Sequence, residues 1–218
     1  MGAAPQAPRT RVTARARDLR FDAGSLSLNL VATVGRRPVG PVERMGDAER
    51  LAAWCRGVGL TLAPGYPADA LLRSLHSLRD AAYDIASSLL DGHHPSPASV
   101  DLVNALAAGE PPAPRLELTA DGVRPAPGSD LLTENALLSA VARDLIALVS
   151  DESHRERLTM CASEVCRMLY LNPASGRPRQ WCSMRRCGNT AKAAAHRRRR
   201  SATDGDQPWS RPSKPDTT

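Results

Sequence analysis

Residues 161–187, CASEVCRMLYLNPASGRPRQWCSMRRC, hold four of the five cysteines of the chain. Cys161 and Cys166 form one C-x4-C pair, Cys182 and Cys187 form another, and fifteen residues separate the pairs. Two such pairs are typical of a zinc site with four thiolate ligands. Two disulfides are the alternative, but they require an oxidising compartment, and we find no secretory signal in the first residues. We therefore predict one structural Zn²⁺ bound by these four cysteines.

The residues around the two pairs predict a small treble-clef-like module over residues 153–200. We expect a turn at each cysteine pair, a hairpin in which short strands at 167–173 and 176–181 pair, and a final helix from Thr190 to about Arg200 capped by Asn189. A segment this short has too little apolar core to fold by burial alone. The bound metal would therefore supply the folding energy of the module.

The charge of the chain is strongly uneven. Residues 155–200 hold twelve basic side chains against two acidic ones, whereas residues 21–154 hold ten against seventeen. This asymmetry indicates a polyanion partner, most often nucleic acid. The alternative is a solvated basic run that complements the dipole of the last helix. We predict nucleic-acid contacts from the basic side chains Arg179, Arg185, Arg186, Lys192, His196, Arg197, Arg198, Arg199 and Arg200.

The end of the module resembles a known family. Residues 179–200, RQWCSMRRCGNTAKAAAHRRRR, are similar to the CGNR zinc finger, a C-terminal module of bacterial proteins described as stress-induced transcription regulators. WCSM at 181–184, CGN at 187–189 and AK at 191–192 carry this resemblance. Thr190 stands where the family has the arginine of CGNR. The resemblance implies a zinc module that binds DNA.

The preceding part of the chain resembles the ABATE domain, the usual partner of the CGNR finger. FDAG at 21–24, LSLNL at 26–30 and LAAW at 51–54 carry the likeness. Together the two resemblances imply a bacterial transcription regulator active in a stress response. Its body would sense a signal or form a homodimer.

Apolar periodicity predicts a mainly α (α+β) protein, with a helical N-terminal body, a small β element and the zinc module. We expect helices at 47–58, 67–91, 96–106 and 131–149, a hairpin at 115–125, and either a strand or a short buried helix within 19–34. The helix at 67–91 has the clearest buried stripe. It consists of Leu71, Leu75, Leu78, Ala82, Ile85 and Leu89. In the helix at 131–149 the predicted buried side includes Leu131.

The 218-residue chain is thus predicted to have four parts. They are a disordered basic arm over 1–18, a mostly helical ABATE-like body over 19–152, the zinc module over 153–200 and a disordered tail over 201–218.

Signatures of enzymes and membrane proteins are missing from the sequence. We find no G-x-S-x-G, H-E-x-x-H, P-loop or dinucleotide-binding motif. No apolar run approaches the roughly 20 residues that cross a bilayer. We expect a cytoplasmic protein that is not an enzyme and that binds duplex DNA. A zinc-stabilised RNA-binding or ribosome-associated protein is the alternative.

Overall fold

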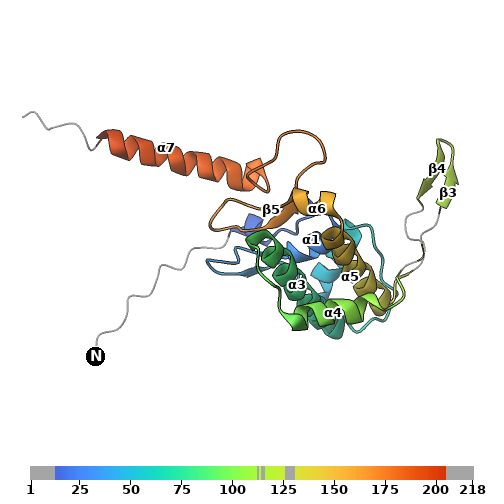
Figure 1. Ribbon diagram of the computed structural model, residues 1–218. Helices are drawn as coiled ribbons and strands as arrows, with labels where there is room; N and C mark the ends of the chain where they lie inside the picture. The colour runs from blue at the N-terminus through green and yellow to red at the C-terminus, as the bar shows by residue number, and fades with distance from the viewer. Residues whose placement is uncertain (1–12, 112, 114–115, 126–130, 205–218) are drawn as a thin grey trace, which may run out of the picture. The chain divides into compact units, whose positions relative to one another are not determined.

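The computed structural model describes residues 13–111, 113, 116–125 and 131–204 (Figure 1). The chain divides into two compact units, with the boundary between Cys182 and Ser183. The helices of the first unit are the 3-10 turn η1 (Ala14–Arg17), α1 (Leu26–Val31), α2 (Ala48–Gly57), α3 (Ala68–Asp91), α4 (Pro97–Ala107), α5 (Glu134–Ser150) and α6 (Glu152–Arg157). The second unit consists of the π-helical turn η2 (Met184–Gly188) and α7 (Asn189–Asp204).

The strands pair in three small antiparallel sheets, each formed by neighbours in sequence. They are β1 (Val34–Gly35) with β2 (Val42–Glu43), β3 (Leu116–Thr119) with β4 (Gly122–Pro125), and β5 (Leu158–Met160) with β6 (Leu169–Leu171). The prediction of a mainly helical fold with a small β element is therefore confirmed.

Helix α3 is the centre of the first unit and packs against α1, α4 and α5 (Figure 1). It ends where predicted, at Gly92, whose φ of 68° is left-handed and favours glycine. The predicted stripe is buried from Leu71 to Ile85, but Leu89 is 42% exposed. All residues of the last turn, 89–91, are exposed, so the helix extends past the elements that cover its earlier turns.

Two leucines of α3, the buried Leu78 and the exposed Leu89, give a matched test of the core. Leu78 is fully buried, so Leu78→Ala is expected to lower the free energy of unfolding by about 2–5 kcal/mol. Leu89→Ala makes the same chemical change on the exposed last turn and should stay within about 0.5 kcal/mol. Urea denaturation of the two variants measures both values. Equal losses would show that the stripe faces the wrong way.

Helix capping explains where three other helices begin. The side chains of Ser25, Asp47 and Thr133 accept hydrogen bonds from backbone N–H groups in the first turns of α1, α2 and α5. The segment 19–34 thus resolves as a helix, and the predicted cap of α2 is confirmed. Because α5 begins after Thr133, Leu131 lies outside it and is 54% exposed, which contradicts its predicted burial.

The predicted hairpin at 115–125 is formed by β3 and β4 around a two-residue turn. Thr119 pairs with Gly122, whose φ is 115°. Leu116, Leu118 and Val123 are 74%, 83% and 64% exposed, so the described residues leave the apolar side of this hairpin uncovered.

The predicted disordered arm over 1–18 is wrong at its end, where η1 forms. The guanidinium of Arg44, which is 7% exposed, donates to the carbonyl of Ala16 at 2.8 Å, and Arg50 donates to the carbonyl of Arg17. These bonds from side chains of the body hold the turn. Residues 1–12 lie outside the described residues.

The predicted tail over 201–218 likewise differs at its start, because α7 continues to Asp204. The residues beyond it are not described. The predicted boundary between body and module, at 152/153, stays a prediction. The boundary between the two compact units is a different one and lies at 182/183.

The predicted pairing of 167–173 with 176–181 is wrong. Strand β6 pairs instead with β5, with Thr159 opposite Tyr170. Leu158 and the whole of β6 are buried, whereas residues 173–180 are exposed and contain two prolines and Gly176 with φ of 99°. Strand β6 therefore pairs with β5, which has an apolar side chain to bury, and not with residues 173–180, which bury none.

Strand β6 is anchored in the first unit by the segment before α1. The N–H of Leu171 donates to the carbonyl of Ala23 at 2.8 Å. Gly24 has a φ of 100°, and a Cβ there would lie 2.9 Å from Cβ of Leu171. Glycine is therefore required for this close approach.

Among the described helices, none combines the length and apolar character needed to cross a membrane.

Candidate zinc centre and basic helix

The first cysteine pair lies in the turn between β5 and β6. The N–H of Cys161 donates to the carbonyl of Met168 at 2.9 Å, and that of Cys166 donates to the carbonyl of Ser163 at 2.8 Å. Arg167 follows with a φ of 52°, a left-handed conformation that is uncommon for arginine. The backbone thus folds Cys161 and Cys166 toward each other.

The second pair is shaped by a π-helical turn. The carbonyl of Ser183 accepts hydrogen bonds from the N–H groups of Cys187, at 2.9 Å, and Gly188, at 3.1 Å. Single π turns recur at functional sites because they change the direction of side chains within a helix. Here the turn carries Cys187.

The four cysteines form one cluster whose sulfur atoms all lie within 4.8 Å of one another. The Sγ atoms of Cys166 and Cys182 are 3.8 Å apart, far beyond the about 2 Å of a disulfide. Tetrahedral zinc with Zn–S bonds of about 2.3 Å requires sulfur separations of about 3.8 Å. Cys161, Cys182 and Cys187 are buried and Cys166 is half-buried. The geometry fits one structural zinc ion with no ligand position left open for catalysis.

Arg20 is a residue of this site that sequence reasoning missed. Its side chain is 4% exposed, and its NH1 lies 3.7 Å from Sγ of Cys182. Asp22 holds the guanidinium with two bonds of 2.7 Å. Burial alone lowers the pKa of Arg20, but the bonds to Asp22 and the charge of Cys182 raise it above its ordinary value. A positive charge fixed beside a thiolate stabilises the ligand in its metal-binding form.

We expect Arg20→Met to weaken zinc binding about 10- to 100-fold, the usual cost of losing a partner of a metal ligand. Methionine keeps most of the buried volume but removes the charge and the N–H···S contact. Competition with a chromophoric zinc chelator measures the affinity. Arg56→Met, at an exposed position of α2, is the control. Equal zinc affinity of the two variants would contradict this role for Arg20.

Arg179, predicted to contact nucleic acid, takes part in the structure around β6. Its NH2 donates to the carbonyl of Leu171 at 3.0 Å, and its guanidinium lies 4.9 Å from the centre of the Tyr170 ring. The hydroxyl of Tyr170 donates in turn to the carbonyl of Arg179. Burial raises the pKa of Tyr170 to about 12, so this donor stays protonated. Arg179 therefore braces the loop that leads to Cys182.

Asn189 does not cap the last helix, contrary to prediction. Its N–H donates to the carbonyl of Met184, so η2 and α7 run on without a break. Its side chain is exposed and aligns with Lys192, His196 and Arg199, at spacings of three and four residues. Asn189 thus joins the polar face of α7, which the periodicity of a continuous helix could have indicated.

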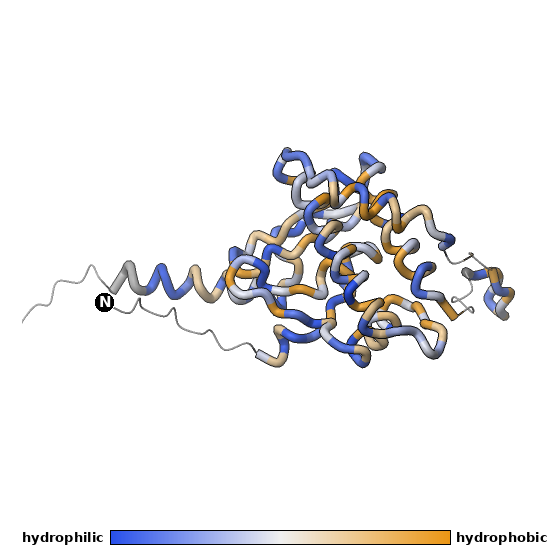
Figure 2. The backbone as a smooth tube through the Cα atoms, turned by 90° about the horizontal axis from the view of Figure 1, so that it is seen from below, coloured by the Kyte–Doolittle hydropathy of each residue, from blue (hydrophilic) through white to orange (hydrophobic). Residues whose placement is uncertain are grey.

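The other predicted nucleic-acid contacts gather in the second unit. Arg185, Lys192, His196 and residues 197–200 are exposed, and Arg186 is half-buried. Figure 2 shows how the tube of α7 changes from tan near its start to blue where the arginine run lies. Lys192, His196 and Arg199 lie on one face of α7, away from the half-buried Ala191 and Ala194, whereas the four consecutive arginines at 197–200 point all round the helix.

Comparison with known families agrees with these features. A family model described as "Putative stress-induced transcription regulator", the ABATE domain, matches residues 24–152, more than half of the chain. The chain belongs to the ABATE family. A second model, the CGNR zinc finger, matches residues 157–200 of this ABATE protein. No curated protein matches the chain.

The two matches confirm both resemblances drawn from the sequence. Because the CGNR match spans all four cysteines of the cluster, the ABATE protein is a zinc-containing member of a regulator family.

Proposed function

We propose that this ABATE protein is a transcription regulator whose zinc module binds duplex DNA. The observation that carries the proposal is the continuity of η2 and α7, because it joins the zinc ligand Cys187 directly to an exposed cationic helix face. A metal ligand at its base would hold this helix in a defined orientation.

The dimensions and charge of α7 suit the major groove of DNA. Its 16 residues extend over about 24 Å, and a groove of about 12 Å width admits one α-helix. Arginine and lysine side chains contact phosphates, which contributes affinity without sequence preference. Asn189 and Arg185 are exposed, each lies two residues from the metal ligand Cys187, and both have donors suited to base edges. We assign sequence preference to them and affinity mainly to residues 197–200.

An RNA-binding protein is the second candidate, because phosphate contacts alone do not distinguish the two nucleic acids. Competition separates them. Full-length zinc-loaded protein bound to a fluorescent 20-base-pair DNA duplex is titrated with unlabelled DNA or RNA duplex of equal length. Our proposal predicts that DNA displaces the probe at least about tenfold more effectively, since the deep, narrow major groove of RNA does not admit a helix. Stronger displacement by RNA would support the alternative.

The remaining parts of the proposal concern how the protein works. It would act in the bacterial cytoplasm by binding and not as an enzyme. A homodimer formed through the helical body would present two modules to a pseudo-palindromic site, as symmetric regulators do. Light scattering of the zinc-loaded protein tests this point, and a monomer at micromolar concentration would contradict it.

A further inference from the structure

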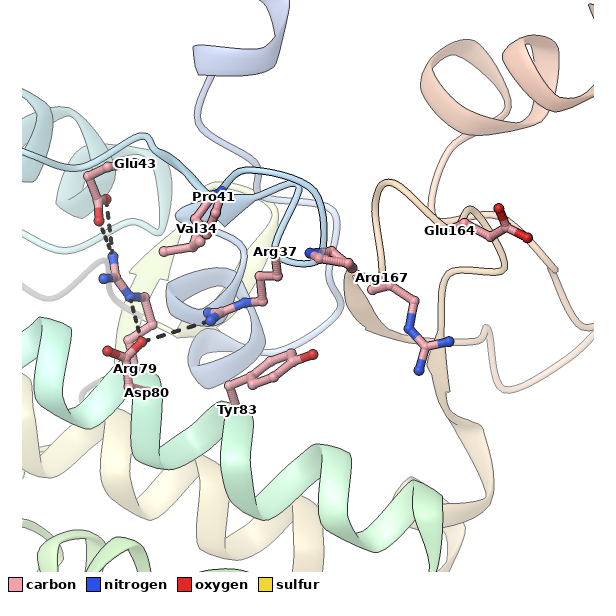
Figure 3. Close-up of a pocket in the computed structure, with 10 residues that line it drawn as sticks. Val34, Arg37, Pro41, Glu43, Arg79, Asp80, Tyr83, Glu164 and Arg167 are labelled. Atoms are coloured by element: carbon pink, nitrogen blue, oxygen red, sulfur yellow. Dashed lines mark hydrogen bonds and ion pairs between the residues drawn. The ribbon is translucent and has the colours of Figure 1, made fainter. Parts of the chain in front are cut away.

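A pocket of about 880 Å³ lies in the first unit, beside the turn that carries the first cysteine pair (Figure 3). Its walls come from three places: β1, β2 and the loop between them, helix α3, and the cysteine turn itself. Ligand pockets usually have volumes of about 300–1,000 Å³. The residues lining it are Val34, Arg37, Pro38, Pro41, Glu43, Arg79, Asp80, Tyr83, Glu164 and Arg167.

One of the three arginines that line the pocket, Arg79, forms a close ion pair with the carboxylate of Glu43. NH1 of Arg79 donates to both oxygens of Glu43, at 3.0 and 2.8 Å, and Arg79 is 5% exposed. Burial alone raises the pKa of Glu43, but the N–H of Met45 and the charge of Arg79 bring it below its ordinary value. The pair is thus ionised and holds β2 to α3.

The second arginine, Arg37, has no carboxylate within hydrogen-bond distance among the described residues. It is half-buried, its guanidinium lies 4.0 Å from the centre of the Tyr83 ring, and one nitrogen donates to the carbonyl of Val31 at 3.3 Å. Its nearest carboxylate oxygen, on Asp80, is 3.9 Å away, beyond hydrogen-bond distance, and also contacts Arg79. Burial and repulsion from Arg79 lower the pKa of Arg37. An incoming anion would therefore be stabilised beside it.

The third arginine, Arg167, borders the pocket from the cysteine turn. Within the described residues its side chain makes no hydrogen bond or ion pair, and it is exposed. Figure 3 shows Arg79 and Glu43 on one side of the pocket, Arg167 on the other and Tyr83 between them, while Glu164 extends away from Arg37. Two guanidinium groups with unused donors thus border one cavity.

We propose that this pocket binds a small organic carboxylate with an apolar ring. The carboxylate would accept hydrogen bonds from Arg37 and Arg167, and the ring would pack against Val34, Pro38 and Pro41. Charge-assisted bonds of this kind are the stronger ones in proteins. This inference goes beyond the proposed function and does not depend on DNA binding.

The position of the pocket gives such a ligand a route to the zinc module. Arg167 directly follows the zinc ligand Cys166 and holds a left-handed φ of 52°. A carboxylate bound to Arg167 and to Arg37 would tie the cysteine turn to the helical body. Binding should therefore lower amide hydrogen exchange over residues 161–168.

The test uses full-length zinc-loaded protein and calorimetric titration with three probes. They are 1-naphthoate, its neutral analogue 1-naphthamide, and acetate, which has the charge but no ring. We expect 1-naphthoate to bind at least about tenfold more tightly than either control, because it alone satisfies both parts of the pocket. Equal affinity for 1-naphthamide, equal affinity for acetate, or no binding of 1-naphthoate would each overturn the proposal.

Variants locate the binding site. Arg37→Gln and Arg167→Gln should each weaken 1-naphthoate about tenfold. Arg73→Gln, at an exposed position of α3 outside the pocket, should leave it unchanged. Arg167 is exposed and supports no other described side chain, so its variant should keep the fold even if Arg37→Gln does not. Unchanged affinity in Arg167→Gln would contradict the assigned site.

Discussion

Removal of zinc is expected to unfold residues 161–168 and the second unit while β5 and β6 stay paired. Structural zinc contributes about 10–16 kcal/mol of apparent binding free energy in small modules, as much as the stability of a whole domain. Isolated helices of about 15 residues are marginal in water, so α7 should lose its order without the metal. Leu169 and Tyr170 are fully buried in the first unit, which should preserve the two strands.

Hydrogen exchange followed by mass spectrometry, with and without a zinc chelator, measures this outcome segment by segment. Cys182→Ser should behave as the chelated protein does. Cys55→Ser is the matched control, since Cys55 is buried in α2, outside the cluster, and should leave zinc content unchanged. Full protection of 183–204 after zinc removal would contradict the metal's structural role. So would the absence of zinc from freshly purified reduced protein.

Replacing residues 197–200 with alanine is expected to flatten the salt dependence of DNA binding by about three to four units. On duplex DNA each neutralised phosphate contributes about −0.9 to the slope of log affinity against log salt. Four arginines that each hold about one phosphate therefore account for this change. Alanine has the highest helix propensity, so the loss would reflect charge and not a broken helix.

Fluorescence anisotropy at several salt concentrations gives the slopes. The control replaces Arg56 and Arg73, two exposed arginines of the helical body, with alanine. We expect the control to keep the wild-type slope, whereas the fourfold variant loses affinity for all sequences alike. Equal slopes in the two variants would exclude the arginine run from the DNA contact.

Local chemistry explains which features could be predicted from the sequence. Zinc needs four thiolates at short separations, so two C-x4-C pairs reveal the site before any fold is known. The cap at Asp47 and the left-handed stop at Gly92 also depend only on neighbouring residues. These features were confirmed because no distant contact competes with them.

The features that were missed depend on distant contacts. Strand β6 pairs with β5 because Ala23 and Gly24 receive Leu171, far away in sequence. Arg20 lies 162 residues before Cys182, in a stretch rich in arginine, so nothing marks it as a partner of the metal site. A possible signal was the FDAG motif at 21–24, whose glycine makes the approach of β6 possible.

The exposed leucines show the same limit for burial. Leu89 continues the apolar stripe of α3, yet it lies beyond the elements that cover the helix. Periodicity gives the direction of a side chain but not the length of the surface that covers it. Where α3 leaves its cover depends on how α1, α4 and α5 pack.

The central claim is that zinc organises a helix that binds DNA, and one titration tests it most directly. Full-length protein is titrated against a 20-base-pair duplex at 50 and 200 mM salt, first zinc-loaded and then after chelation. We predict tight, steeply salt-dependent binding by the zinc-loaded protein, with affinity falling by roughly 10³-fold across this range for about six phosphate contacts. Chelation should weaken binding at both concentrations, because the basic residues are then no longer held on one ordered helix. Zinc-loaded protein that shows no salt-dependent binding, or binding that chelation leaves unchanged, would contradict the account.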